Sequence, residues 1–156
     1  MSMENTIYKK ARERALYLLT ARDYSFAELY KKLAANYDEE ICVSVCSEMA
    51  ERGYINDLGY AERKARELFE VKGFGVYRVK RELTLKGLSN DIIEAALELY
   101  EDDEAALERL EELVARKYER YLTDEKGVKR VKSALARLGY SFGDIDAVLE
   151  LYDLDF

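Results

Sequence analysis

Two short basic motifs are the residues whose types and spacing could do chemistry in this chain. Arg78-Val79-Lys80 recurs as Arg130-Val131-Lys132. Guanidinium and ammonium groups at fixed spacing bind phosphates or carboxylates without any covalent step. Two basic helices one repeat apart would line one groove and face a polyanionic or acidic partner. The candidate contact residues are Arg78, Lys80, Arg81, Lys86, Lys129, Arg130, Lys132 and Arg137. An alternative interpretation is that these cations only form the solvated face of helices with buried valines.

The motifs lie within an internal repeat. Residues 75–100 align without gaps to residues 127–152, at an offset of 52, and 14 of the 26 aligned positions are identical. Residues 25–50 resemble a third and weaker copy, in which Tyr37 replaces the turn glycine. Stacked repeats build extended binding surfaces, whereas an enzyme seldom needs the same chemistry twice. The repeat therefore favours a binding function.

The residue types argue against catalysis and against a metal or cofactor site. The chain has no histidine, which removes the commonest general base and the commonest zinc ligand. Its carboxylates are spread along the chain without the glycine-rich context of a small-molecule site. Cys42 and Cys46 lie one helical turn apart, but two thiols cannot complete a four-ligand zinc site. We expect two free, buried cysteines and no enzymatic activity.

The elements that must position the basic motifs are helices. The 156 residues include no proline, and apolar residues recur at spacings of three and four. This pattern predicts an all-α chain of about nine helices in tandem three-helix units, forming an elongated, curved array. The predicted units are residues 5–53, 57–102 and 104–156. Each unit is too small to bury much core alone and is expected to lean on its neighbour.

Capping residues and glycines mark the helix ends. Ser25 with Glu28 forms a capping-box pattern, and Asp38 and Asp57 are predicted N-caps. Ile7 is expected on the core side of the first helix and Tyr121 on that of a long seventh helix, residues 104–122. The chain has 13 tyrosines, many after turn residues, which we expect to cover short cores with their hydroxyls in water; stacking on nucleobases is the alternative.

Charge is unevenly distributed along this acidic chain. The net charge is −7, which by itself does not suggest a nucleic-acid-binding protein. Residues 75–87 nevertheless carry a local charge of +3, and residues 127–138 carry +4. Residues 98–112 are acidic and are either a plain solvated face or a contact for basic loops of a partner. Their acids are Glu98, Glu101, Asp102, Asp103, Glu104, Glu108, Glu111 and Glu112.

Targeting signals are absent from the sequence pattern. No apolar run approaches the ~20 residues that span a bilayer, and the first residues lack a basic and then apolar signal-peptide pattern. The two cysteines fit a reducing compartment. We therefore expect a cytoplasmic protein that does not contact membranes.

Three blocks of residues together form a recognisable pattern. The first runs from Ala15-Leu16 through Arg22 to Lys32-Leu33. The second begins at residues 53–57, continues through Tyr60-Ala61-Glu62, and reaches Gly75, Arg78, Glu82-Leu83 and Lys86-Gly87-Leu88. The third is Lys129 through Leu135, then residues 137–142 and Ile145. In their order and spacing the three blocks resemble the RecX family of bacterial RecA regulators, although Leu138 stands where the family has a second arginine.

The resemblance implies a function. It implies a protein that binds RecA and lies in the groove of the RecA–single-stranded-DNA filament. We expect the protein to be a monomer. Such a protein would modulate, mostly by inhibition, recombinase and coprotease activity in DNA repair, recombination and the SOS response. The alternative is a helix-turn-helix-like module that binds DNA directly without RecA; weak direct DNA binding is compatible with either interpretation.

Overall fold

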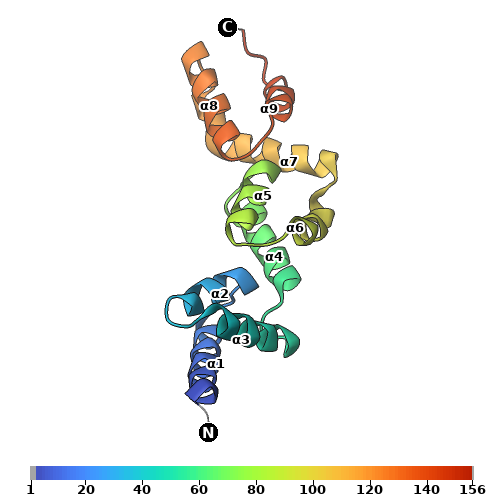
Figure 1. Cartoon of the computed structure of the whole chain (residues 1–156). Coiled ribbons are helices and arrows are strands. Elements are labelled where there is room, and N and C mark those ends of the chain that lie inside the picture. Colours follow the sequence, from blue (N-terminus) through green and yellow to red (C-terminus); the bar gives the residue numbers. More distant parts are fainter. Residues whose placement is uncertain (1–2, 156) are drawn as a thin grey trace.

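The computed structural model describes residues 3–155, and within that range the chain is all-α, with nine α-helices and no strand (Figure 1). The predicted fold class is confirmed. The helices form an elongated array with the two termini at opposite ends. Their bounds are α1 Met3–Ala21, α2 Phe26–Ala34, α3 Glu39–Glu51, α4 Asp57–Arg66, α5 Val76–Leu85, α6 Asn90–Leu97, α7 Asp103–Leu113, α8 Glu125–Arg137 and α9 Phe142–Leu149.

The core is divided into three hydrophobic clusters rather than being continuous. The first joins α1, α2 and α3, the second α4, α5 and α6, and the third α7, α8 and α9. Leu29 and Leu33 of α2 occupy the first cluster as Val79 and Leu83 of α5 occupy the second. We propose units 5–53, 57–102 and 104–156 on this basis, with Ile55 of the intervening linker packed into the first cluster.

The long seventh helix changes its winding along its length. After α7 the backbone forms a π-helical segment, η3 (Val114–Tyr118), and then a 3-10 turn, η4 (Glu119–Tyr121). A similar π-helical segment, η1 (Glu67–Val71), follows α4. The change turns Tyr121 outward, where it is 49% exposed, so its predicted place on the core stripe is wrong.

The predicted caps are mostly confirmed. Ser25 forms the full capping box with Glu28, and the Asp38 carboxylate accepts from the Ile41 N–H. The prediction for Asp57 is wrong, because Asn56 is the N-cap of α4 and its side chain accepts from the Gly59 N–H. The Asp57 carboxylate instead forms a contact between units. Ile7 is also more exposed than its core assignment predicts.

The first and second units meet through polar groups. The Ser25 hydroxyl donates to the carbonyl of Lys86 at the C-terminal end of α5, at 2.6 Å. The Asp57 carboxylate accepts from the Phe26 N–H at 2.8 Å, and Arg63 pairs with Asp23 at 2.9 Å. The N-terminus of α2 is therefore held at the C-terminus of α5, where opposite ends of the two helix dipoles attract.

The second and third units meet in the same manner. At the N-terminus of α5, the Gly75 N–H donates to the Leu138 carbonyl at 2.8 Å and the Tyr77 N–H to the Gly139 carbonyl at 3.2 Å. Both acceptors lie at the C-terminal end of α8. Each internal junction thus joins the start of one unit's second helix to the end of the next unit's second helix. These contacts use N–H groups that have no partner inside their own helix.

The repeated glycine at the start of α5 and within α8 has one physical role in both places. A Cβ on Gly75 would lie 2.5 Å from the Gly139 carbonyl oxygen, which comes from the next unit. A Cβ on Gly127 would overlap the Tyr121 carbonyl oxygen, which comes from η4 of the same unit. A backbone carbonyl approaches each glycine. At Gly75 the carbonyl comes from the third unit, whereas at Gly127 it comes from the same unit as the glycine.

Tyr140 ties the second junction together and provides a test of it. Its hydroxyl donates to the Gly73 carbonyl at 2.8 Å, so for this tyrosine the expectation of a hydroxyl in water is wrong. Burial raises the pKa of Tyr140 to about 12. The neutral phenol is thus favoured by folding, and its contribution to stability is present below pH 10 and is lost as the pH rises toward 12.

Replacing Tyr140 with phenylalanine is expected to lower the free energy of unfolding by about 1 kcal/mol at neutral pH. The difference between the two proteins should shrink between pH 10 and 12, because the wild type alone loses this contribution there. Denaturant unfolding followed by circular dichroism at several pH values measures both effects. Tyr54→Phe at an exposed position is the control. A Tyr140→Phe difference that is constant with pH would contradict a neutral, hydrogen-bonded phenol.

Among residues 3–155, no helix combines the length and the apolar character needed to cross a bilayer.

Candidate functional site: a cationic stripe on α5 and α8

The eight predicted contact residues all lie on α5, at its C-cap, or on α8. These are the second helices of the second and third units, whose ends meet at the junction described above. Repetition of the basic motif therefore places cations on two helices that are in direct contact. Three of the eight have structural partners, and the other five lack an ion pair within the described residues.

Arg78, Lys86 and Lys132 are held by interactions within the fold. The Arg78 guanidinium pairs with Glu82 at 3.2 Å, donates to the Arg137 carbonyl at 3.0 Å and lies over the Phe74 ring at 4.3 Å. The Lys86 ammonium lies 3.9 Å from the Glu28 carboxylate, and that of Lys132 lies 3.4 Å from the Asp146 carboxylate. These cations stabilise junctions and helix pairs.

The remaining cations are exposed, and the described part of the chain offers them no ion pair. Lys80 borders a cavity whose lining includes four carboxylates, so its surroundings are mixed in charge. Along α8, residues 126, 130 and 137 recur at helical spacing on one face, with residue 129 beside them. We define the cationic stripe as the five exposed residues Arg81, Lys126, Lys129, Arg130 and Arg137.

A groove of about 560 Å³ joins the two helices of the stripe. Arg81 of α5 and Arg137 of α8 both line it, together with Tyr77 and Arg78. Gly139 forms part of its wall and has φ +103°, a conformation that favours glycine. The tight turn after α8 thus brings Arg81 and Arg137 to one groove, although neither belongs to the repeated motif, and Arg78 is the one motif residue in its lining. The lining of this groove includes no carboxylate, so an anionic group in it would meet several positive charges.

Three family models match this chain, one over each of the three units. The family models match as "RecX, first three-helix domain" over residues 11–49, "second" over residues 56–97 and "third" over residues 103–149. The chain belongs to the RecX family.

Relatives in this family are similar over most of their length. The Regulatory protein RecX of Trichlorobacter lovleyi is 34% identical over 130 residues, covering 81% of this chain and 84% of the relative. That of Vibrio parahaemolyticus is 31% identical over 147 residues, covering 93% of each chain. The crystal structure of RecX from Lactobacillus salivarius has a TM-score of 0.81 at 27% identity, covering 94% of this chain and 97% of that one.

The cysteines of this RecX-family chain are structural. Cys42 and Cys46 are buried and free, as predicted. Burial raises the pKa of the Cys46 thiol to about 11, so the nucleophilic thiolate is disfavoured at neutral pH. Within residues 3–155 no cluster of three or more histidine, cysteine, aspartate or glutamate side chains could hold a metal ion.

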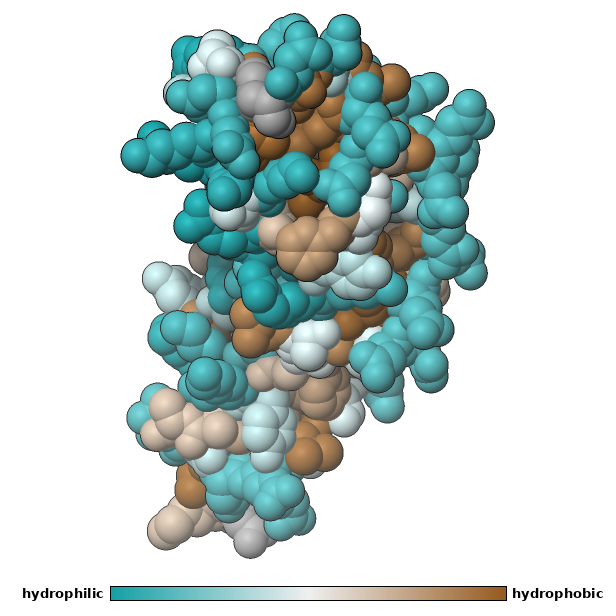
Figure 2. Space-filling view, turned by 90° about the horizontal axis from the view of Figure 1, so that it is seen from above, coloured by the Kyte–Doolittle hydropathy of each residue, from teal (hydrophilic) through white to brown (hydrophobic). Residues whose placement is uncertain are grey.

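Sequence reasoning missed four residues that line the groove or lie on or beside the stripe. Lys126 precedes the aligned repeat by one position, and Tyr77 aligns with Lys129, so neither stood out as a repeated basic residue. Arg120 and Tyr121 lie before the repeat in η4. The sequence does not indicate that these two residues lie beside α8, because that depends on where α8 begins. Figure 2 shows that hydrophilic side chains cover much of the face around the third unit, with apolar atoms visible between them.

Proposed function

We propose that this protein is a non-catalytic regulator that binds RecA and the RecA–single-stranded-DNA filament and modulates, mostly inhibits, recombinase and coprotease activity. The observation that carries the proposal is the cationic stripe, which continues across two units of a RecX-family array. The stripe contacts the filament. Family membership supports the partner, since the relatives are named regulatory proteins.

An elongated array suits a partner that is itself a repeating filament. Several modest contacts on linked units gain affinity because the first contact raises the effective concentration of the others. The stripe gathers positive charge on a chain whose net charge is −7, so it offers a polyanion a local site of attraction. Bridging of neighbouring filament subunits would block growth or strand exchange without any chemical step.

The eight basic residues have different roles in this proposal. Arg81, Lys129, Arg130 and Arg137 contact the partner, with Lys80 at the edge of the surface. Arg78, Lys86 and Lys132 position the helices, because each already has a partner in the fold. The protein acts in the cytoplasm, as a monomer.

Reversing Arg81, Arg130 and Arg137 to glutamate is expected to weaken binding to RecA filaments by ~10-fold or more. The slope of log affinity against log salt concentration should fall by about three, one for each lost phosphate contact. Cosedimentation with the filament measures binding, and inhibition of the DNA-dependent ATPase of RecA measures the effect. The matched control reverses Lys9, Lys10 and Lys72, which changes net charge equally but lies outside the stripe.

Two results would contradict the proposal. If a large excess of the wild-type protein leaves RecA activity unchanged, the protein is not a RecA regulator. If the stripe variant inhibits as well as the control while its circular dichroism is native, the stripe is not the contact surface. Salt-sensitive binding to DNA without any effect on RecA would instead support the alternative, a helix-turn-helix-like DNA-binding module, which the same cations favour.

A further inference from the structure

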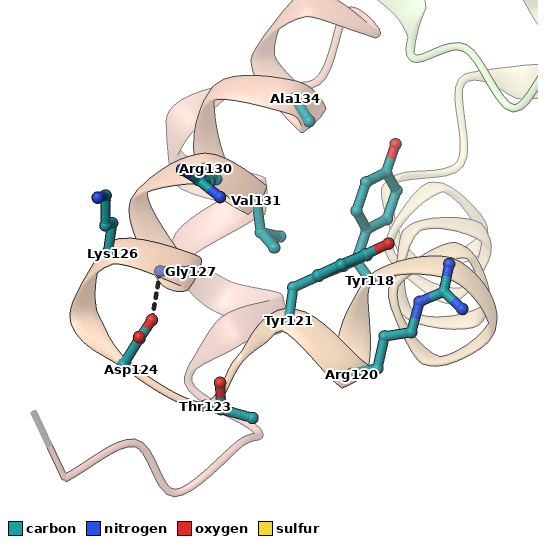
Figure 3. Close-up of a pocket in the computed structure, with 10 residues that line it drawn as sticks. All are labelled: Tyr118, Arg120, Tyr121, Thr123, Asp124, Lys126, Gly127, Arg130, Val131 and Ala134. Atoms are coloured by element: carbon teal, nitrogen blue, oxygen red, sulfur yellow. Dashed lines mark hydrogen bonds between the residues drawn. The ribbon is translucent and has the colours of Figure 1, made fainter.

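A cavity of about 420 Å³ lies at the start of α8, at one end of the cationic stripe (Figure 3). Tyr118 and Tyr121 form one wall, and Val131 and Ala134 point into the cavity from α8 opposite them. The volume lies within the range of small-ligand sites. The cavity therefore offers an apolar, partly aromatic interior to a flat group.

The rim of this cavity is positively charged. Arg120, Lys126 and Arg130 lie on it, against the single carboxylate of Asp124. One oxygen of that carboxylate is already used, because it accepts from the Gly127 N–H at 2.7 Å. Among the described residues, none of the three cations has an ion-pair partner. An anion at the rim is therefore attracted by the three unneutralised cations.

The equivalent arginines of the two repeats differ in their contacts. Arg130 is the equivalent of Arg78, which is held by a carboxylate, a carbonyl and an aromatic ring at the junction. Arg130 is exposed and makes no ion pair among the described residues. Tyr121 is 49% exposed, and the Arg120 guanidinium lies 4.9 Å from the centre of its ring. An aromatic side chain thus lies at the surface with a cation over its ring.

We propose that this cavity binds an unpaired base of single-stranded DNA, with the adjoining phosphates on the cationic stripe. The base stacks against Tyr121, as bases do on aromatic side chains of single-strand-binding proteins. From Lys126 to Arg137 the stripe follows α8, a helix of 13 residues that is about 20 Å long. A base within a duplex remains paired and stacked and does not enter. The proposal deepens the proposed function, on which its biological setting rests.

The test uses fluorescence anisotropy of the full chain at low salt without RecA. The probes are a short oligothymidine and a strand of equal length that lacks all its bases. We expect the oligothymidine to bind ~5-fold or more tightly, the lower end of what one stacked base contributes. Tyr121→Leu should abolish this difference, while Arg130→Gln should weaken binding of both strands. Tyr54→Leu is the control, because Tyr54 is similarly exposed, at 53%, but belongs to the first unit.

The following results of this experiment would overturn the cavity proposal. Equal binding of the two strands, no binding of either, or an unchanged preference in Tyr121→Leu would show that no base enters. Displacement of the DNA by a polyglutamate peptide at lower concentration than by unlabelled oligothymidine would assign the cavity to an acidic protein instead. RecA inhibition is measured separately on the same variants. A preference for the oligothymidine without RecA inhibition would support the cavity proposal and refute the proposed regulatory function. RecA inhibition without that preference would refute the cavity proposal and support the regulatory function.

Discussion

Replacing Gly139 with alanine is expected to lower the free energy of unfolding by about 3–5 kcal/mol and to separate the second and third units. Gly139 has φ +103°, which an alanine adopts only with strain. An added Cβ would also overlap the backbone nitrogen and the Cβ of Arg78. Relief of that overlap requires the turn to move away from α5. The hydrogen bonds from Gly75 and Tyr77 to this turn would then be lost.

The matched control for Gly139→Ala is Gly53→Ala. Gly53 has φ +80°, but a Cβ added to it would meet no atom within 4 Å. Its substitution therefore carries only the conformational cost, about 1 kcal/mol. Chemical denaturation measures both free energies, and small-angle scattering detects an opened junction as a larger radius of gyration. Equal destabilisation by the two substitutions would mean that the junction does not form in solution.

Replacing Ser25 with alanine is expected to lower the free energy of unfolding by about 2–4 kcal/mol. The side chain is fully buried and makes two hydrogen bonds. Its oxygen accepts from the Glu28 N–H at 3.1 Å, which caps α2, and its hydroxyl donates to the Lys86 carbonyl at 2.6 Å in the next unit. The alanine variant thus loses a helix cap and leaves a carbonyl unpaired at the first junction.

Ser89→Ala separates these two contributions. Ser89 caps α6 by accepting from the Ile92 N–H at 3.3 Å, but it is exposed. Its loss is expected to cost about 1 kcal/mol, the value for a helix cap alone. The additional free energy of unfolding that Ser25→Ala loses, compared with Ser89→Ala, measures the contribution of the contact between units. If thermal and chemical unfolding give the same loss for both variants, the hydroxyl contact with Lys86 contributes nothing to stability.

The junctions connect stability to the proposed function. The groove between α5 and α8 has Arg81 and Arg137 on its walls only because the turn at Gly139 fits against Arg78. A variant that opens this junction would separate the cations while leaving their number unchanged. Gly139→Ala should therefore also weaken filament binding, and for that reason loss of function in this variant does not identify a contact residue. The charge reversals, made on exposed side chains, serve that purpose.

The sequence predicted the fold class and helix starts correctly where local chemistry decides the structure. Helical spacing and the absence of proline predicted the all-α fold, and the caps at Ser25 and Asp38 predicted the starts of α2 and α3. It failed where a side chain serves a distant segment. Asp57 resembles an N-cap, yet its carboxylate accepts from Phe26 in the preceding unit. Tyr140 resembles a surface tyrosine, yet its hydroxyl reaches Gly73. Such contacts depend on how units stack, which helical periodicity does not encode.

By itself, the sequence determined the three-helix repeat, the helical class and the concentration of cations in two equivalent segments. These follow from residue spacing and helix geometry alone. Only the tertiary structure decided which cations are available. Arg78 and Arg130 are equivalent in the repeat, but Arg78 contacts the third unit at a junction, whereas Arg130 is exposed and has no such contact among the described residues. The contacts between units, rather than the repeated sequence, therefore set whether the same arginine holds the fold or is exposed.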